Sequence, residues 1–185
     1  MRVLNPNAVN ANISVELISA DGRYVPLGLD NRKIASDRVE DIAFDVDAKN
    51  SAFALKITSD QPIAASVYSR VLAKAKTDFV WSSAVPPAIK GTWAITGLDP
   101  VLVASGSKLD ISLKILMPKG KKIGKRIIGT DIAAYRVPQG ALGIQVLTIA
   151  SDNSLALIVN SQSGTGYLPL LNGSSLTRST VPTAN

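Results

Sequence analysis

Five positive charges crowd one short stretch of the chain, ILMPKGKKIGKRII at residues 115–128. Closely spaced cations can bind phosphate or carboxylate groups, so this stretch is a candidate contact for an anionic partner. The competing interpretation is a solvated turn between two strands, where charge is readily tolerated, and the sequence favours that interpretation. The candidate residues are Lys119, Lys121, Lys122, Lys125 and Arg126.

Aromatic residues offer a second candidate site. Trp81 and Trp93 are the two tryptophans of the chain, and with Tyr68 and Tyr167 they could form a sugar-stacking surface. Tryptophan in a small β-sandwich is usually part of the packing, and packing is the favoured interpretation here. The sugar-binding hypothesis requires Trp81 or Trp93 to be exposed to solvent.

The sequence gives little support for catalysis or metal binding. The chain has no cysteine, which excludes disulfides and thiolate metal sites, and no histidine, which removes the commonest general base and most zinc sites. Asp45 and Asp47 alternate along a predicted strand but lack the spacing of a calcium-binding loop. SQSGTGYL at 161–168 lacks the ending of a phosphate-binding loop. We therefore expect no enzymatic activity, no cofactor and no metal site.

Composition and charge bound the class of protein. The 185 residues are 46% hydrophobic and 18% charged, which is typical of a folded protein, and the net charge of +6 favours acidic partners. No apolar run reaches the roughly 18 residues needed to span a bilayer. The start, MRVLNPNAVNANISVEL, lacks the apolar core of a signal peptide. We expect a cytoplasmic protein if Met1 is the true start, and otherwise a part of a longer exported protein.

An internal repeat organises the elements that would carry these residues. Residues 12–39 align with 110–137 without a gap, and a looser match relates 50–68 to 153–169. Alternating apolar residues with turn signals such as Asp-Gly predict short β-strands. We therefore predict an all-β fold made of two tandem immunoglobulin-like β-sandwich modules. Identities within the main alignment include Ile13/Ile111, Gly22/Gly120 and Arg38/Arg136.

The repeat also predicts a division of the chain. A short helix over 69–76 competes with an extension of the preceding strand. PKGKK takes the place of ADGRY in the first copy, which makes the cationic stretch the tip of a hairpin. The predicted parts are a first sandwich at 1–75, a packed link with both tryptophans at 76–100, a second sandwich at 101–171, and a disordered tail at 172–185.

Several stretches resemble a known family. RVLNPNAVNANISVELISADGRYVPLGL, the later TSDQPIAASV and the link TDFVWSSAVPP are similar to secreted actinobacterial proteins of unknown function. The resemblance covers most of residues 2–171 and implies tandem β-sandwich domains exported to the cell envelope. It supplies no catalytic residues. Unlike the family, the sequence shows no leader before RVLNP, so we expect export only if an N-terminal part precedes it, and the second copy does not have the Asn-Pro start.

The leading hypothesis is a non-enzymatic structural or adhesive module of the cell envelope or extracellular space. Its partner would be a protein or an anionic or glycan polymer of the envelope. One alternative is an intracellular basic β-protein that binds nucleic acid, and another is a carbohydrate-binding module. The nucleic-acid alternative is weakened because the sequence shows only one cluster of cations.

Overall fold

The computed structural model describes residues 1–46, 52–73, 76–95, 99–161 and 164–171. Within these ranges the chain is all-β, and its only helical turn is the short 3-10 segment Pro118–Gly120. The predicted all-β class is thus confirmed. None of the described residues forms a helix long and apolar enough to cross a membrane.

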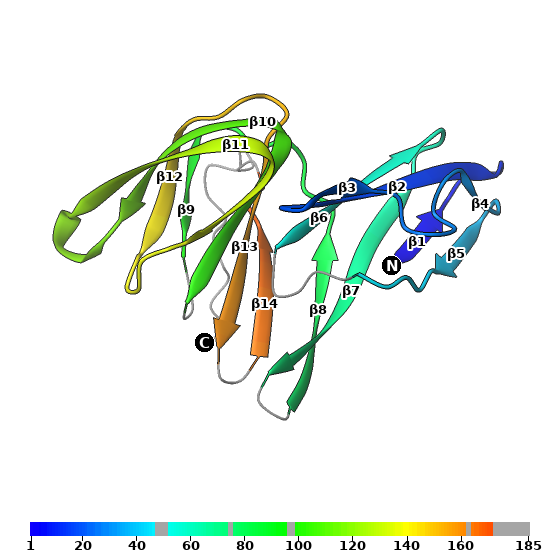
Figure 1. The fold of residues 1–185 in the computed structure, drawn as a ribbon, viewed down its shortest axis with the longest axis horizontal. Coiled ribbons are helices and arrows are strands. Elements are labelled where there is room, and N and C mark those ends of the chain that lie inside the picture. Colours follow the sequence, from blue (N-terminus) through cyan, green and yellow to red (C-terminus); the bar gives the residue numbers. More distant parts are fainter. Residues whose placement is uncertain (47–51, 74–75, 96–98, 162–163, 172–185) are drawn as a thin grey trace, which may run out of the picture.

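The first half of the chain forms two antiparallel sheets (Figure 1). The β1 sheet has the order β5-β1-β7-β8, and in the β2 sheet β2 pairs with β3, β4 and β6. The bounds of the β1 sheet are Arg2–Asn5 (β1), Arg38–Asp41 (β5), Ala64–Ala73 (β7) and Lys76–Ser83 (β8). Those of the β2 sheet are Ala11–Ser19 (β2), Gly22–Tyr24 (β3), Arg32–Ile34 (β4) and Phe53–Ser59 (β6).

Alternation along β2 explains why this half folds as two facing layers. Ile13, Val15 and Leu17 are fully buried, whereas Ser14 and Glu16 lie on the other face of the strand. Successive side chains of a strand point to opposite faces, so one apolar row covers a core. The first core contains Ile13 and Val15 together with Val3 from the β1 sheet, so it lies between the two layers.

A buried asparagine closes one end of the first core. Asn5 ends β1, and its side-chain nitrogen donates to the carbonyl oxygens of Val9 (2.8 Å) and Ala35 (3.0 Å). Its side-chain oxygen accepts from the backbone and side-chain nitrogens of Asn7. A buried polar group is tolerated when its hydrogen bonds are satisfied. The Asn-Pro sequence therefore fixes the turn from β1 towards β2.

The second half forms one six-stranded sheet, here the β10 sheet. Its order is β14-β13-β10-β12-β9, with β11 also paired to β10. The strands enclose a second core that includes Leu102, Ile111 and Leu157. Their bounds are Gly91–Ala94 (β9), Pro100–Leu116 (β10), Lys122–Arg136 (β11), Gly143–Thr148 (β12), Ser154–Ser161 (β13) and Gly164–Pro169 (β14).

The long strand β10 takes part in both walls of this core. Residues 100–105 pair with β13, residues 112–116 pair with β12, and β11 follows both parts. The β10–β11 register shifts between Gly106 and Leu109. At that point the buried Asn153 lies against Gly106 and donates to the carbonyl oxygen of Lys108 at 2.9 Å. The lack of a side chain at Gly106 therefore lets the turn before β13 close onto the bend.

Strand pairing follows the same order in both halves. β1 pairs with β5 and β7, as the first part of β10 pairs with the end of β11 and with β13. β2 pairs with β3 and β6, as the second part of β10 pairs with the start of β11 and with β12. β6 thus corresponds in position to β12. The looser match of 50–68 to 153–169, which aligned β6 with β13, relates strands in different positions and is wrong.

The segment expected to be a packed link contains two strands. Within 76–100, β8 is the outer strand of the β1 sheet and β9 is the outer strand of the β10 sheet. The stretch weighed as a helix at 69–76 is extended as far as Ala73. The proposed tail, 172–185, lies outside the described residues.

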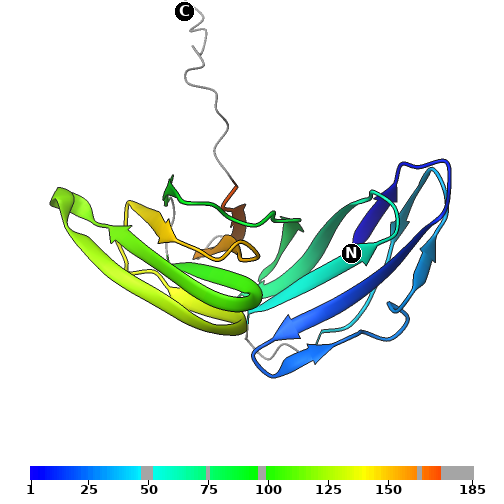
Figure 2. The ribbon, with the colours of Figure 1, turned by 90° about the horizontal axis from the view of Figure 1, so that it is seen from above.

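The two halves meet along β8 and β14 and at the β2–β3 hairpin (Figures 1 and 2). The hydroxyl of Tyr167 on β14 donates to the carbonyl oxygen of Ser83 at 3.1 Å. The Arg23 side chain donates to the carboxylate of Asp131 on β11, with Nε at 2.9 Å. Residues far apart in sequence therefore connect the halves at two separate places.

Candidate binding surfaces

Three exposed rings form a cluster on the outer face of β7 and β8. Tyr68 lies opposite Trp81 in the strand register, with ring centroids 5.2 Å apart, and its ring stacks on Phe79 with centroids 5.6 Å apart. Ala65 and Val67 of β7 pack against the core, so alternation turns Tyr68 outward. The exposed fractions are 39% for Tyr68, 57% for Phe79 and 42% for Trp81. We call these three residues the aromatic cluster.

One side of the aromatic cluster is bounded by an ion pair. Arg2 donates to both carboxylate oxygens of Asp41, each at 2.7 Å, and its guanidinium lies 5.6 Å from the centroid of the Trp81 ring. Ser66, which has a small side chain, is the register partner of Arg2 on β7. Hydrogen bonding to Arg2 lowers the pKa of Asp41. The charge of Arg2 is therefore already matched.

A second arginine lies beside the rings without such a partner. Arg70 faces Phe79 in the β7–β8 register and follows Tyr68 by two residues, which places its side chain on the same outer face. It is exposed and forms no ion pair with any described residue. The aromatic cluster thus combines apolar rings with one available positive charge.

Trp93 has a different environment from Trp81. It lies on β9, packs against the second core, and its indole N–H donates to the carbonyl oxygen of Leu171 at 2.8 Å. Its ring covers Gly91, where a Cβ atom would lie 2.9 Å from the indole. The structure therefore brings Trp81 together with Tyr68 and Phe79 but leaves Trp93 in another sheet. Tyr167 contributes its hydroxyl to the contact between the halves, and burial raises its pKa.

The cationic stretch is a hairpin whose charges have unequal surroundings. Leu116 pairs with Lys122 across the tip formed by Pro118–Gly120. Arg126 donates to both carboxylate oxygens of Asp110, each at 2.9 Å, which lowers the pKa of Asp110. The ammonium of Lys125 lies 4.9 Å from the centroid of the Tyr135 ring. The three remaining cations of the hairpin are exposed at or beside the tip: Lys119, Lys121 and Lys122.

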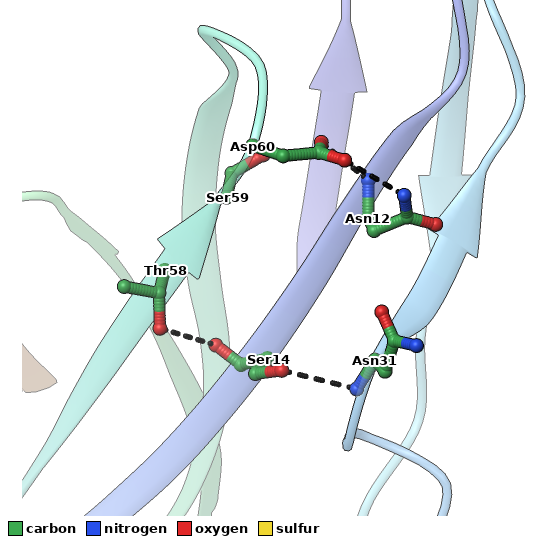
Figure 3. A pocket seen from close by; sticks show the side chains of 6 residues that line it. All are labelled: Asn12, Ser14, Asn31, Thr58, Ser59 and Asp60. Carbon is green, nitrogen blue, oxygen red and sulfur yellow. Dashed lines mark hydrogen bonds between the residues drawn. The ribbon is translucent and has the colours of Figure 1, made fainter.

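A shallow polar hollow of about 280 Å³ lies on the outer face of the β2 sheet (Figure 3). The carboxylate of Asp60 accepts hydrogen bonds from the backbone and side-chain nitrogens of Asn12, each at 2.7 Å, which lowers its pKa. The hydroxyl of Ser14 accepts from the backbone of Asn31 at 3.0 Å and donates to Asp30. These polar groups already form hydrogen bonds with one another. The hollow is therefore an ordinary part of the sheet surface rather than a ligand site. Its lining comprises Asn12, Ser14, Asn31, Thr58, Ser59 and Asp60.

No group of three acidic, histidine or cysteine side chains that could hold a metal occurs among the described residues. Asp47, half of the calcium pattern weighed from the sequence, lies outside them. Arg2, Arg70 and Phe79 were missed as site residues. Phe79 alternates with Trp81 in the sequence, but this strand signal is hidden because residues 77–100 as a whole show no sustained period.

The model of a family of unknown function, DUF5719, matches residues 1–134. The chain belongs to this family. The match extends through the aromatic cluster and the cationic hairpin of this DUF5719 member and ends within β11. No curated protein and no solved structure is significantly similar to the chain. The resemblance to a family of unknown function is thereby confirmed.

Proposed function

We propose that this DUF5719 protein is a non-enzymatic adhesive module of the cell envelope or extracellular space that binds a polysaccharide through its aromatic cluster. The observation that carries the proposal is the exposure of Tyr68, Phe79 and Trp81 side by side on one sheet face. The lack of histidine and cysteine in the sequence supports a binding role over catalysis. The envelope location is supported by the resemblance to secreted proteins.

Exposed apolar surface of this kind is typical of an interaction site, since rings in water gain free energy when a partner covers them. Sugar rings present C–H groups on one face, and these pack against the electron-rich faces of aromatic rings. Pairing of β7 with β8 holds the three rings in place before a ligand arrives. Little ordering free energy would therefore oppose binding.

The proposed architecture is two tandem immunoglobulin-like β-sandwich modules. The gap-free alignment of 12–39 with 110–137 and the shared order of strand pairing support it. In the second half, the continuous strands β10 and β11 join the two layers that remain separate sheets in the first. The modules would share this order of pairing but differ in their connections and in the additional strands β4 and β9.

The structure gives the nucleic-acid alternative less support. Binding a single strand requires cations and exposed aromatic rings along one surface. The cationic hairpin tip and the aromatic cluster lie in different halves, at a distance from each other (Figure 1). Arg126 and Lys125, moreover, already have partners within the protein.

Co-sedimentation with purified cell-wall sacculi and with insoluble xylan tests the proposed function. We expect the wild-type protein to bind at least one of them, and the Phe79→Ala/Trp81→Ala variant to lose at least about 10-fold in affinity. Tyr24→Ala is the matched control, because it removes an exposed ring from the β2 sheet. Wild-type protein that binds neither material, or a double variant that binds as well as wild type, would overturn the proposal.

A further inference from the structure

We infer that the polysaccharide bound by the aromatic cluster is acidic, with a carboxylate on the stacked sugar ring that is bound by Arg70. This inference rests on the proposed function and adds the chemical class of the ligand. It identifies Arg70 as the residue that determines specificity.

The strand register places the charge next to the stacking surface. Arg70 is the direct partner of Phe79 on the neighbouring strand. Side chains at such positions have Cβ atoms about 4.5–5.5 Å apart and share one face of the sheet. A sugar stacked on Phe79 would therefore present its ring substituents within reach of the Arg70 guanidinium.

The two arginines of this face differ in availability. Arg2 donates to both oxygens of the Asp41 carboxylate, so this pair offers no net charge to a ligand. Arg70 is exposed and has no ion-pair partner among the described residues. A negative group on a ligand would thus be attracted towards Arg70 rather than towards the neutral Arg2–Asp41 pair. The face has a charged end and a neutral end.

A uronic acid is the ligand unit that fits this spacing. Its carboxylate is attached directly to the sugar ring, whereas the phosphate of a sugar-phosphate polymer lies between units. Arginine forms paired hydrogen bonds with carboxylates, the geometry that Arg2 and Asp41 already show on this face. The net charge of +6 complements a polyanion as a whole.

Isothermal titration with polygalacturonate and with its carboxyl-reduced form tests the inference. We expect the wild-type protein to bind the acidic polymer at least about 10-fold more tightly than the reduced one, the typical effect of one charged hydrogen-bonded contact. Arg70→Ala should abolish this preference, and Arg70→Lys should retain part of it. Lys33→Ala is the matched control, because it removes an exposed charge from the β2 sheet.

Several outcomes would overturn the inference. Equal binding of both polymers by wild type, an equal loss in Arg70→Ala and Lys33→Ala, or tighter binding of poly(ribitol phosphate) would each do so. A dimer that Phe79→Ala/Trp81→Ala dissociates would show that a second copy covers the face. If wild type binds the reduced polymer through Phe79 and Trp81 but ignores carboxylates, the inference fails while the proposed function stands. If it binds none of the polymers or wall preparations, both fail.

Discussion

Trp81 and Trp93 lie on the outer strands of two different sheets and have opposite relations to the protein interior. The Trp81 ring is open to solvent beside Tyr68, whereas the Trp93 ring packs on the second core and hydrogen-bonds to Leu171. Trp81 is therefore part of an exposed surface in the first half, whereas Trp93 stabilises the core of the second half. Mutation separates these two roles.

Alanine substitution of the two tryptophans should have unequal effects on stability. Trp93→Ala removes packing from the core and should lower the free energy of unfolding by about 3–5 kcal/mol. Trp81→Ala removes cross-strand contacts at the surface and should lower it by no more than about 1 kcal/mol. Urea denaturation of both variants measures the difference. Equal losses would show that Trp81 contributes to the core.

Gly106→Ala should destabilise the second half by about 1–3 kcal/mol. The new methyl group would overlap the buried side chain of Asn153, which is held by its bond to Lys108. Gly124→Ala provides the control on the same hairpin, because a Cβ atom there meets no neighbour within 4 Å. Thermal unfolding of both variants compares them, and similar midpoints would contradict the proposed tight packing at the bend.

The Arg23–Asp131 pair should couple the two halves weakly but measurably. Both side chains are about one-third exposed, at 34% and 30%, so solvent screens most of their attraction. A double-mutant cycle with Arg23→Ala and Asp131→Ala should give a coupling free energy of about 0.5–1 kcal/mol. Raising the salt concentration should reduce this coupling. A coupling of zero at low salt would show that the contact does not stabilise the folded state.

Acid should destabilise the protein below about pH 4. Hydrogen bonds lower the pKa values of Asp41, Asp60, Asp110 and Asp152 in the folded state. Stability from these carboxylates is fully present above the unfolded pKa of about 3.9 and is lost as the pH falls through the lower folded values. Urea midpoints at several pH values between about 6 and 2 measure the loss.

One variant separates this effect from general charge repulsion in acid. Asp60→Asn should flatten the acid dependence, because Asp60 accepts two hydrogen bonds from Asn12. Asp21→Asn removes the same charge from an exposed carboxylate that accepts no hydrogen bond from a described residue, and it should leave the slope closer to wild type. If stability fell with pH equally steeply in both variants, the loss of stability in acid would be due to net charge alone.

Local patterns predicted much of the fold. The alternation of β2 and the position of PKGKK as a hairpin tip both follow from short-range rules, and the structure has both. The pairing of β13 with the first part of β10 could not be predicted, because it accompanies a register shift at Gly106 where Asn153, distant in sequence, packs. Long-range register is set by tertiary contacts rather than by the strand's own residues.

The surfaces were less predictable than the strands. Trp81 was a candidate from its residue type alone, but its exposure depends on which face of β7 and β8 covers the core. The pairing of Arg126 with Asp110 follows only once the register of the β10–β11 hairpin is known. Charge clusters in a sequence therefore overstate the charge available to a partner.

The continuous β10–β11 hairpin has a consequence for the order of folding. Its pairing begins at Leu116 and Lys122, six residues apart, and can extend from there one pair at a time. In the first half, β1 must find β7, with Val3 and Ala65 separated by 62 residues. Contacts between distant residues close slowly because the intervening chain loses more entropy. The β10–β11 hairpin should therefore form before β10 pairs with β13, because Pro100 and Val159 are separated by 59 residues. Once formed, the hairpin can serve as the template on which β13 docks.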